Sequence, residues 1–204
     1  MFATPQATHE DELEWVVRVR QGDKNAFAYL VEKYQNAVYN LCYRMLGNPG
    51  DAEDAAQESF LRAYKALDRY DQKRKFSTWI LSIATHYCID QLRKRRLLTL
   101  SFDAMPYLDV SEKGPGPETR LVMDERRDQV RRLLATLNEK DRAAVILRYW
   151  YDYSYDEIAE VLSLTNSAVK SRLHRARRAL ARAWAAQEPQ PLPVQRMPYE
   201  AQSL

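Results

Sequence analysis

Residues 154–180 read SYDEIAEVLSLTNSAVKSRLHRARRAL, a stretch that predicts a short helix, a tight turn and a second, basic helix. Ser154 and Glu157 have the spacing of a capping box, in which each side chain bonds the backbone N–H of the other residue. The turn falls at Ser163 and Leu164, and Thr165 can cap the second helix. Two helices joined in this way have the geometry of a helix-turn-helix DNA-binding motif.

The second helix separates an apolar stripe from a basic face. At about 100° per residue, Val169, Leu173, Ala176 and Leu180 fall on one side. The other side gathers cations and small polar groups, and no acidic residue occurs in 165–187. A solvated helix usually mixes charge signs, so this face indicates binding to phosphates and guanine edges.

Apolar residues recur at steps of three and four along most of the chain, which predicts an all-α fold. Asp23 is a plausible N-cap for a helix that ends at the Gly47–Gly50 turn, and Asp51 can cap the next helix, which runs to about Arg69. After a loop at 70–75, a further helix is expected from about Ser77 to Arg96. The expected later helices are about 119–136, 139–151, 154–162 and 165–187.

Periodicity stops between Thr99 and Thr119, where prolines, glycines and acidic side chains collect. This composition predicts a flexible acidic linker between two helical domains. The expected division is an N-terminal tail at 1–10, a first domain at 11–97, a linker at 98–118, a second domain at 119–187 and a proline-rich tail at 188–204.

Composition argues against several other classes of protein. The formal net charge is only +3, but cations cluster at 91–96 and 165–187, which indicates a polyanion bound at defined places. Cys42 and Cys88 lie in apolar helical patterns without a CxxC motif, and His174 has no partner at metal-ligand spacing, so we expect no metal, cofactor or catalytic site. With no signal peptide and no apolar span, we expect a cytoplasmic protein without membrane insertion.

The stretch YDEIAEVLSLTNSAVKSRLHRARRAL (155–180) closely resembles region 4 of the sigma-70 superfamily, and LNEKDRAAVILRYW (137–150) resembles the lead helix of that region. Residues 25–70 and the segment KFSTWILSIATHYCIDQLRKRR (75–96) resemble region 2. A chain with these two regions alone resembles the extracytoplasmic-function, or group IV, sigma factors. The resemblance implies a sigma factor that binds core RNA polymerase through its β′ clamp helices and β flap, recognises promoter DNA and promotes strand opening. It also implies an anti-sigma partner.

The resemblance further implies roles for particular residues. The helix that matches the polymerase-docking surface holds Asp54, Gln57, Glu58, Phe60 and Arg62. The match to the −35 contacts covers Thr165, Lys170, Ser171, His174, Arg175 and Arg178. The match to the −10 contacts covers Tyr70, Lys73, Arg74, Lys75, Phe76, Ser77 and Thr78, with Arg93, Arg95 and Arg96 near phosphates. Trp79 starts a helix whose apolar face is buried, so we expect it in the core rather than at a base, whereas Phe76 is ambiguous between these two roles.

The main alternative is a helix-turn-helix repressor or activator that binds DNA without polymerase. Such a protein has no need for the second basic cluster at 91–96 beside an aromatic-rich loop. The turn also departs from the family pattern, because Ser163 occupies a position where glycine is common, and residues 166–168 differ from the usual Val-Gly-Thr. These departures leave the −35 sequence open.

Overall fold

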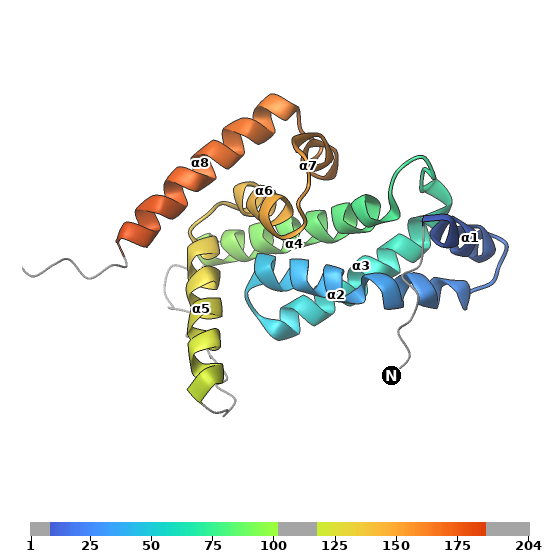
Figure 1. The fold of residues 1–204 in the computed structure, drawn as a ribbon, viewed down its shortest axis with the longest axis horizontal. Helices are drawn as coiled ribbons and strands as arrows, with labels where there is room; N and C mark the ends of the chain where they lie inside the picture. The colour runs from blue at the N-terminus through green and yellow to red at the C-terminus, as the bar shows by residue number, and fades with distance from the viewer. Residues whose placement is uncertain (1–8, 102–117, 187–204) are drawn as a thin grey trace, which may run out of the picture.

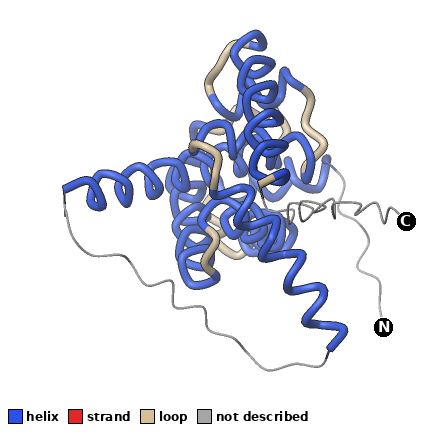
Figure 2. Tube along the Cα trace, turned by 90° about the vertical axis from the view of Figure 1, so that its left-hand side faces the viewer, coloured by secondary structure: helices blue, strands red, loops and turns tan. Residues whose placement is uncertain are grey.

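The computed structural model describes residues 9–101 and 118–186, and the regular elements in those two ranges are all helical (Figures 1 and 2). The expected N-terminal and C-terminal tails and most of the expected linker therefore lie outside the described residues. The helices are α1 (His9–Arg20), α2 (Ala26–Leu46), α3 (Pro49–Ala66), the 3₁₀ turn η1 (Leu67–Arg69), α4 (Phe76–Ser101), α5 (Glu118–Ala135), α6 (Glu139–Trp150), α7 (Tyr155–Leu162) and α8 (Asn166–Ala185).

The first domain packs α2, α3 and α4 around an apolar core, with α1 lying against α2. The core side of α2 buries Leu30, Val38, Leu41, Cys42 and Met45, whose spacing places them on one face of the helix. The side of α3 that meets it is built largely from alanines, namely Ala52, Ala55, Ala56 and Ala63. Because these side chains are small, the axes of the two helices can approach closely.

Several helix boundaries differ from the sequence prediction, among them the start of α2, whose N-cap is Asn25 and not Asp23. Asn48, not Asp51, caps α3, because its side chain accepts the backbone N–H of Asp51 at 3.1 Å and Pro49 occupies the first helical position. Helix α4 begins at Phe76 and continues to Ser101 rather than ending near Arg96, so the start of the expected linker is helical. Gly47 ends α2 with φ of 79°, a left-handed conformation that suits glycine.

The second domain confirms the helix-turn-helix prediction. Ser154 and Glu157 form both hydrogen bonds of the capping box at the start of α7. Ser163 ends α7 with φ of 52°, which explains why this position in the turn suits glycine. The Thr165 side chain accepts the backbone N–H of Ala168 and caps α8.

The two domains pack against each other, whereas the sequence suggested two bodies connected only by a linker. Helix α7 lies on α4, and α6 contacts both α2 and α4 (Figure 1). Across this interface the Tyr151 hydroxyl donates to the Ala37 carbonyl at 2.5 Å. Arg142 and Arg131 donate to the carbonyls of Met45 and Gly47, at 2.6 and 3.2 Å, at the carboxyl end of α2. This end has carbonyls that its own helix leaves without partners, so it attracts cationic donors.

Candidate nucleic-acid and polymerase interfaces

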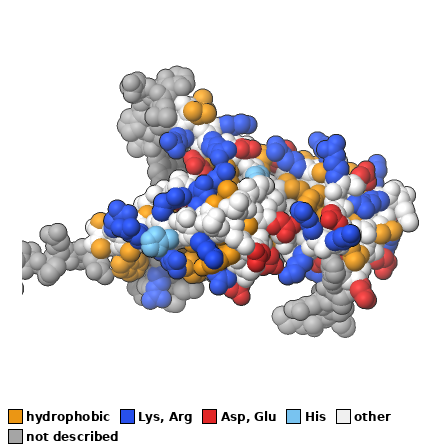
Figure 3. Space-filling view, turned by 90° about the horizontal axis from the view of Figure 1, so that it is seen from above, with side chains coloured by type: hydrophobic (Ala, Val, Ile, Leu, Met, Phe, Trp, Pro, Cys, Tyr) orange, Lys and Arg blue, Asp and Glu red, His pale blue; other side chains and the backbone are white. Residues whose placement is uncertain are grey.

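Helix α8 presents its basic face to solvent. Val169, Leu173 and Ala176 are buried and fix the rotation of the helix in the second domain. All the residues expected at the −35 element are exposed: Thr165, Lys170, Ser171, His174, Arg175 and Arg178. Seen from above, Lys and Arg side chains dominate the α8 part of the surface, and acidic side chains gather further along the molecule (Figure 3). The structure therefore brings the predicted −35 residues together on one accessible face.

A buried carboxylate lies directly behind that face, and sequence reasoning did not predict it. Asp141, in the first turn of α6, has a side chain only 5% exposed. Its Oδ1 atom lies 2.8 Å from Arg172 Nη1 and 3.5 Å from Arg175 Nη2. Its Oδ2 atom accepts a hydrogen bond of 2.8 Å from the Asn138 side chain. The only local signal in the sequence is the Asn138–Asp141 spacing of a helix cap, which does not reveal contacts with α8.

The loop expected at the −10 element is built on an aromatic cluster that faces the core. Tyr70 and Phe76 are buried, and their ring centroids lie 5.4 Å apart. Trp79 packs against both rings, at 4.9 and 5.4 Å. Burial raises the pKa of Tyr70 to about 12, and its hydroxyl donates to the Arg74 carbonyl. The ambiguity of Phe76 is thus settled in favour of the core, and Tyr70, also expected at DNA, holds the loop in shape.

The polar part of the same loop divides into buried and exposed groups. Thr78 is buried and Ser77 is half-buried, whereas Lys73, Arg74 and Lys75 are exposed. The Asp71 side chain accepts the backbone N–H of Lys73 at 3.0 Å and shapes the turn. The three cations are therefore the loop residues that a ligand can reach without rearrangement of the core.

Two of these cations pair with acidic residues of the second domain. Lys75 Nζ lies 3.1 Å from Glu157 Oε1, and Arg74 Nη1 lies 3.1 Å from Glu160 Oε1, both carboxylates being on α7. Beside them, the Ser82 hydroxyl of α4 donates to the Val161 carbonyl at 3.2 Å. In this arrangement α7 covers one side of the loop.

The basic end of α4 is also paired. Arg93 lies 3.9 Å from Asp90, Arg95 lies 2.6 Å from Asp51, and Arg96 lies 3.8 Å from Glu139 of α6. All three cations are exposed. Because exposed ion pairs contribute little to stability, phosphates can compete for these arginines at small cost.

The expected polymerase-docking residues lie mainly on the outer face of α3. Asp54 and Gln57 are exposed, while Phe60 is half-buried and packs on the core. Arg62 pairs with Glu58 at 2.8 Å and lies over the Tyr87 ring. Sequence reasoning missed Leu61 and Tyr64, which are 54% and 38% exposed and continue the face of Gln57. Leu61 and Tyr64 lie one turn apart on this helix and together give the outer face of α3 an apolar part.

A second surface missed from the sequence is an apolar groove of about 430 Å³ between α5, α6 and α8. Its walls include Val130, Leu133, Tyr149, Trp150, Leu180 and Trp184. Tyr149 and Trp150 are 57% and 40% exposed, an unusual exposure for aromatic side chains. The groove can accept an apolar segment of a partner.

Among the described residues, no cluster of His, Cys, Asp and Glu has the arrangement of a metal site, and no helix has the length and apolarity to span a membrane. Cys42 and Cys88 are free and buried between α2 and α4. A hydrogen bond with Cys42, together with burial, raises the pKa of the Cys88 thiol.

Comparison with known proteins agrees with this architecture. The family model for sigma-70 region 2 matches residues 30–97, and the model for sigma-70 region 4 matches residues 127–180. The chain is 39% identical to the ECF RNA polymerase sigma factor SigW of Bacillus subtilis over 173 residues, which is 81% of this chain and 92% of the relative. It is 33% identical to the RNA polymerase sigma-H factor of Pseudomonas aeruginosa over 183 residues, 86% of this chain and 95% of the relative.

Solved structures show the same fold. CnrH in complex with the cytosolic domain of CnrY aligns with a TM-score of 0.65 and 24% identity, over 87% of this chain and 99% of CnrH. The sigma factor RpoE of Bartonella quintana, in complex with the anti-sigma factor NepR, aligns with a TM-score of 0.57 and 21% identity, over 79% and 98% of the two chains.

Two helical domains, one matching region 2 and the other region 4, define an RNA polymerase sigma factor rather than a repressor that acts alone. The chain belongs to the sigma-70 family and, within it, to the extracytoplasmic-function group.

Proposed function

We propose that this chain directs core RNA polymerase to promoters by reading the −35 element with α8 and the −10 element with the loop at 70–78. The observation that carries the proposal is the exposed basic face of α8, which has no acidic residue along Asn166–Ala185. Its N-terminal half carries Lys170, Ser171, His174 and Arg175, side chains suited to base edges in the major groove. Polymerase supplies the catalytic chemistry, and the sigma factor, with no catalytic role of its own, acts beside it in the cytoplasm.

Polymerase docking is assigned to two surfaces. The outer face of α3, with Asp54, Gln57 and the exposed Leu61, would contact the β′ clamp helices. The apolar groove between α5, α6 and α8 would receive the β flap, because its aromatic walls suit an apolar helix. An anti-sigma protein, like the partner in the Bartonella complex, would compete for these surfaces.

Promoter binding requires the two domains to separate. The −35 and −10 elements lie roughly 25 base pairs apart, which corresponds to about 80 Å along B-DNA. In the structure, however, the −10 loop touches the domain that carries α8, with Lys75 only 3.1 Å from Glu157. We therefore propose that the described arrangement is the free form of the protein and that it opens on polymerase.

Strand opening is assigned to the loop cations. Single-stranded DNA is held by positive charge along its backbone together with contacts to unstacked bases. Lys73 and Lys75 are exposed beside the half-buried Ser77, so backbone phosphates can reach the two lysines without disturbing the aromatic cluster.

The test is reconstituted transcription with core polymerase and the full chain. Lys73→Gln with Lys75→Gln should leave polymerase binding intact and should lower the permanganate reactivity of unpaired thymines at the −10 element. Lys24→Gln, at an exposed lysine outside α3 in the first domain, is the control and should change neither. Normal reactivity in the loop variant, within an assembled holoenzyme, would place the opening determinants elsewhere. Tight promoter-specific binding by the free chain would contradict the need for polymerase.

A further inference from the structure

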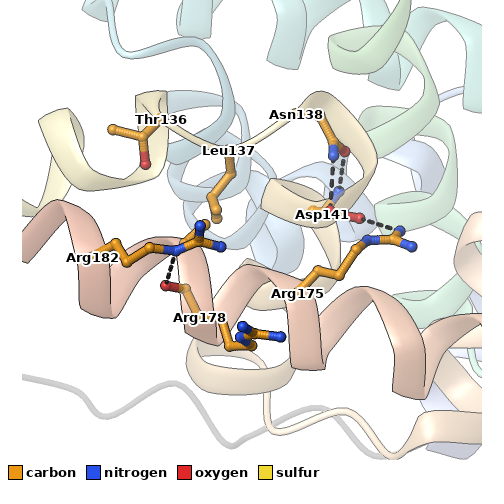
Figure 4. A pocket seen from close by; sticks show the side chains of 8 residues that line it. Thr136, Leu137, Asn138, Asp141, Arg175, Arg178 and Arg182 are labelled. Carbon is orange, nitrogen blue, oxygen red and sulfur yellow. Dashed lines mark hydrogen bonds and ion pairs between the residues drawn. The ribbon is translucent and has the colours of Figure 1, made fainter.

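The cations of α8 are held differently, although all belong to one basic helix. Arg175 lies 3.5 Å from the carboxylate of Asp141, while its side chain remains 59% exposed. Arg178, one turn further along, has no carboxylate partner among residues 10–98 and 125–186, whose side chains the structure describes. In Figure 4, Arg175 points toward Asp141, and Arg178 lies apart from that contact.

Asp141 is itself fixed from both sides. Asn138 caps α6 by accepting the Asp141 backbone N–H at 2.9 Å, and its amide donates to Asp141 Oδ2 at 2.8 Å. On the other side, Arg172 donates to Asp141 Oδ1 at 2.8 Å from a side chain that is only 22% exposed. A carboxylate held by these partners on opposite sides cannot turn to follow a mobile arginine.

We infer that Asp141 is a positioning residue for promoter recognition, which sets the direction in which Arg175 meets the −35 element. This inference rests on the proposed function of α8. One carboxylate between two guanidinium groups leaves a net positive charge of one, so Arg175 keeps its attraction for DNA while one end of its guanidinium pairs with a fixed carboxylate. The remaining N–H donors of the planar group then face a fixed direction.

Preorganisation gives this contact selectivity. An unrestrained arginine loses side-chain freedom on binding and can bend to reach a phosphate or a different base, whereas a held arginine loses less and reaches fewer positions. Holding one such side chain corresponds to about two- to tenfold in affinity. We expect that factor to appear as discrimination at the base that Arg175 reads.

The test compares promoters that differ at single −35 positions, with transcription by the full chain and core polymerase as readout. Asp141→Asn keeps the shape and an acceptor oxygen but removes the charge. It should reduce discrimination about two- to tenfold at one −35 position and leave −10 discrimination unchanged. In an Arg175→Ala background the same substitution should have no further effect on discrimination. Asp152→Asn, at a carboxylate that is 97% exposed in the same domain, is the matched control and should change nothing.

Three outcomes overturn the positioning role. They are an equal loss at every promoter, an effect that persists in the Arg175→Ala background, and unchanged discrimination in Asp141→Asn. The first would show that Asp141 only supports the fold through Arg172. The Arg175→Ala variant separates a failure of this inference from a failure of the proposed function. If Arg175→Ala alone leaves every −35 preference unchanged, the proposed function of α8 fails. If Arg175→Ala changes a −35 preference and Asp141→Asn does not, only the positioning role of Asp141 fails.

A second measurement uses the unaltered chain, in case Asp141→Asn does not fold. The Nε–Hε group of Arg175 should show a higher NMR order parameter than that of Arg178, because only Arg175 pairs with a fixed carboxylate. Equal mobility of the two side chains would overturn the inference.

Discussion

Replacing two carboxylates of α7 should loosen the contact between the domains. The perturbation is Glu157→Gln with Glu160→Gln, which removes the acidic partners of Lys75 and Arg74. Glutamine can still complete the capping box at Ser154, so α7 should keep its start. The change therefore tests the ion pairs between the domains and spares the helix that carries them.

The expected magnitude follows from exposure. The Lys75 and Glu157 side chains are 72% and 29% exposed, and those of Arg74 and Glu160 are 57% and 38% exposed. Such pairs contribute about 0.2–1 kcal/mol each, so the two together shift the closed-to-open equilibrium roughly two- to thirtyfold. Raising the salt concentration to 1 M, where the screening length is about 3 Å, should reproduce much of the shift in the native chain.

The assay is single-molecule energy transfer between dyes on Lys65→Cys and Arg182→Cys, one in each domain. Cys42 and Cys88 are buried and should escape labelling. The double variant should populate a low-transfer state more than the native chain does. Glu32→Gln with Glu53→Gln removes the same charge from exposed positions of the first domain and should not shift the distribution. An unchanged distribution in the α7 variant would refute the reasoning that these pairs hold the domains together.

Three further predictions concern single features. Leu61→Ser should weaken core polymerase binding without lowering the unfolding temperature, because Leu61 is 54% exposed. Leu97→Ser, at a leucine of α4 that is 64% exposed, is the control, and an equal loss of polymerase binding in both variants would refute a specific α3 surface. Ser163→Gly should not destabilise the chain and Ser163→Val should cost about 1 kcal/mol or more, as measured by urea unfolding, because φ is 52° there; equal stabilities would contradict this. The backbone N–H of Ser154 holds the pKa of Glu157 below its ordinary value of 4.5. The ionised Glu157 should therefore stabilise the fold fully above pH 4.5, and this stabilisation should be lost as the pH falls through the lowered pKa. A carbon-13 titration of the Glu157 carboxyl with a midpoint at or above 4.5 would disprove this prediction.

Local patterns in the sequence predicted much of the fold. The capping box at Ser154, the turn at Ser163 and the apolar stripe of α8 depend on residues within a turn or two of one another, and the structure shows all three. The start of α3 was misplaced because Asn48 and Asp51 are both good caps in the same short segment. Pro49, which suits the first helical position, favours Asn48.

The site was harder to predict because its contacts join distant segments. The carboxylate of Asp141 meets Arg172 across 31 residues, and Lys75 meets Glu157 across 82. No pattern among neighbouring residues of the sequence indicates pairs between such distant positions. Phe76, in the loop proposed to read the −10 element, was ambiguous for a different reason, since the same ring can stack on a base or pack in a core. Only the cluster of Tyr70, Phe76 and Trp79 decides between these roles.

Two arginines of the second domain contact main-chain atoms of the first domain instead of its side chains. Arg142 and Arg131 bind the main-chain oxygens of Met45 and Gly47, which every amino acid supplies. A scan that replaces one side chain at a time would therefore detect these hydrogen bonds only through the arginines of α5 and α6, because substitutions at the acceptor positions leave the carbonyl in place and act instead through the burial of Met45 and the left-handed φ of Gly47. Paired-substitution or covariation methods, which look for compensating changes, would miss this part of the interface for the same reason. Relatives could keep the contact with any residues that satisfy the burial of Met45 and the left-handed backbone of Gly47, because the carbonyl oxygen itself does not depend on the side chain.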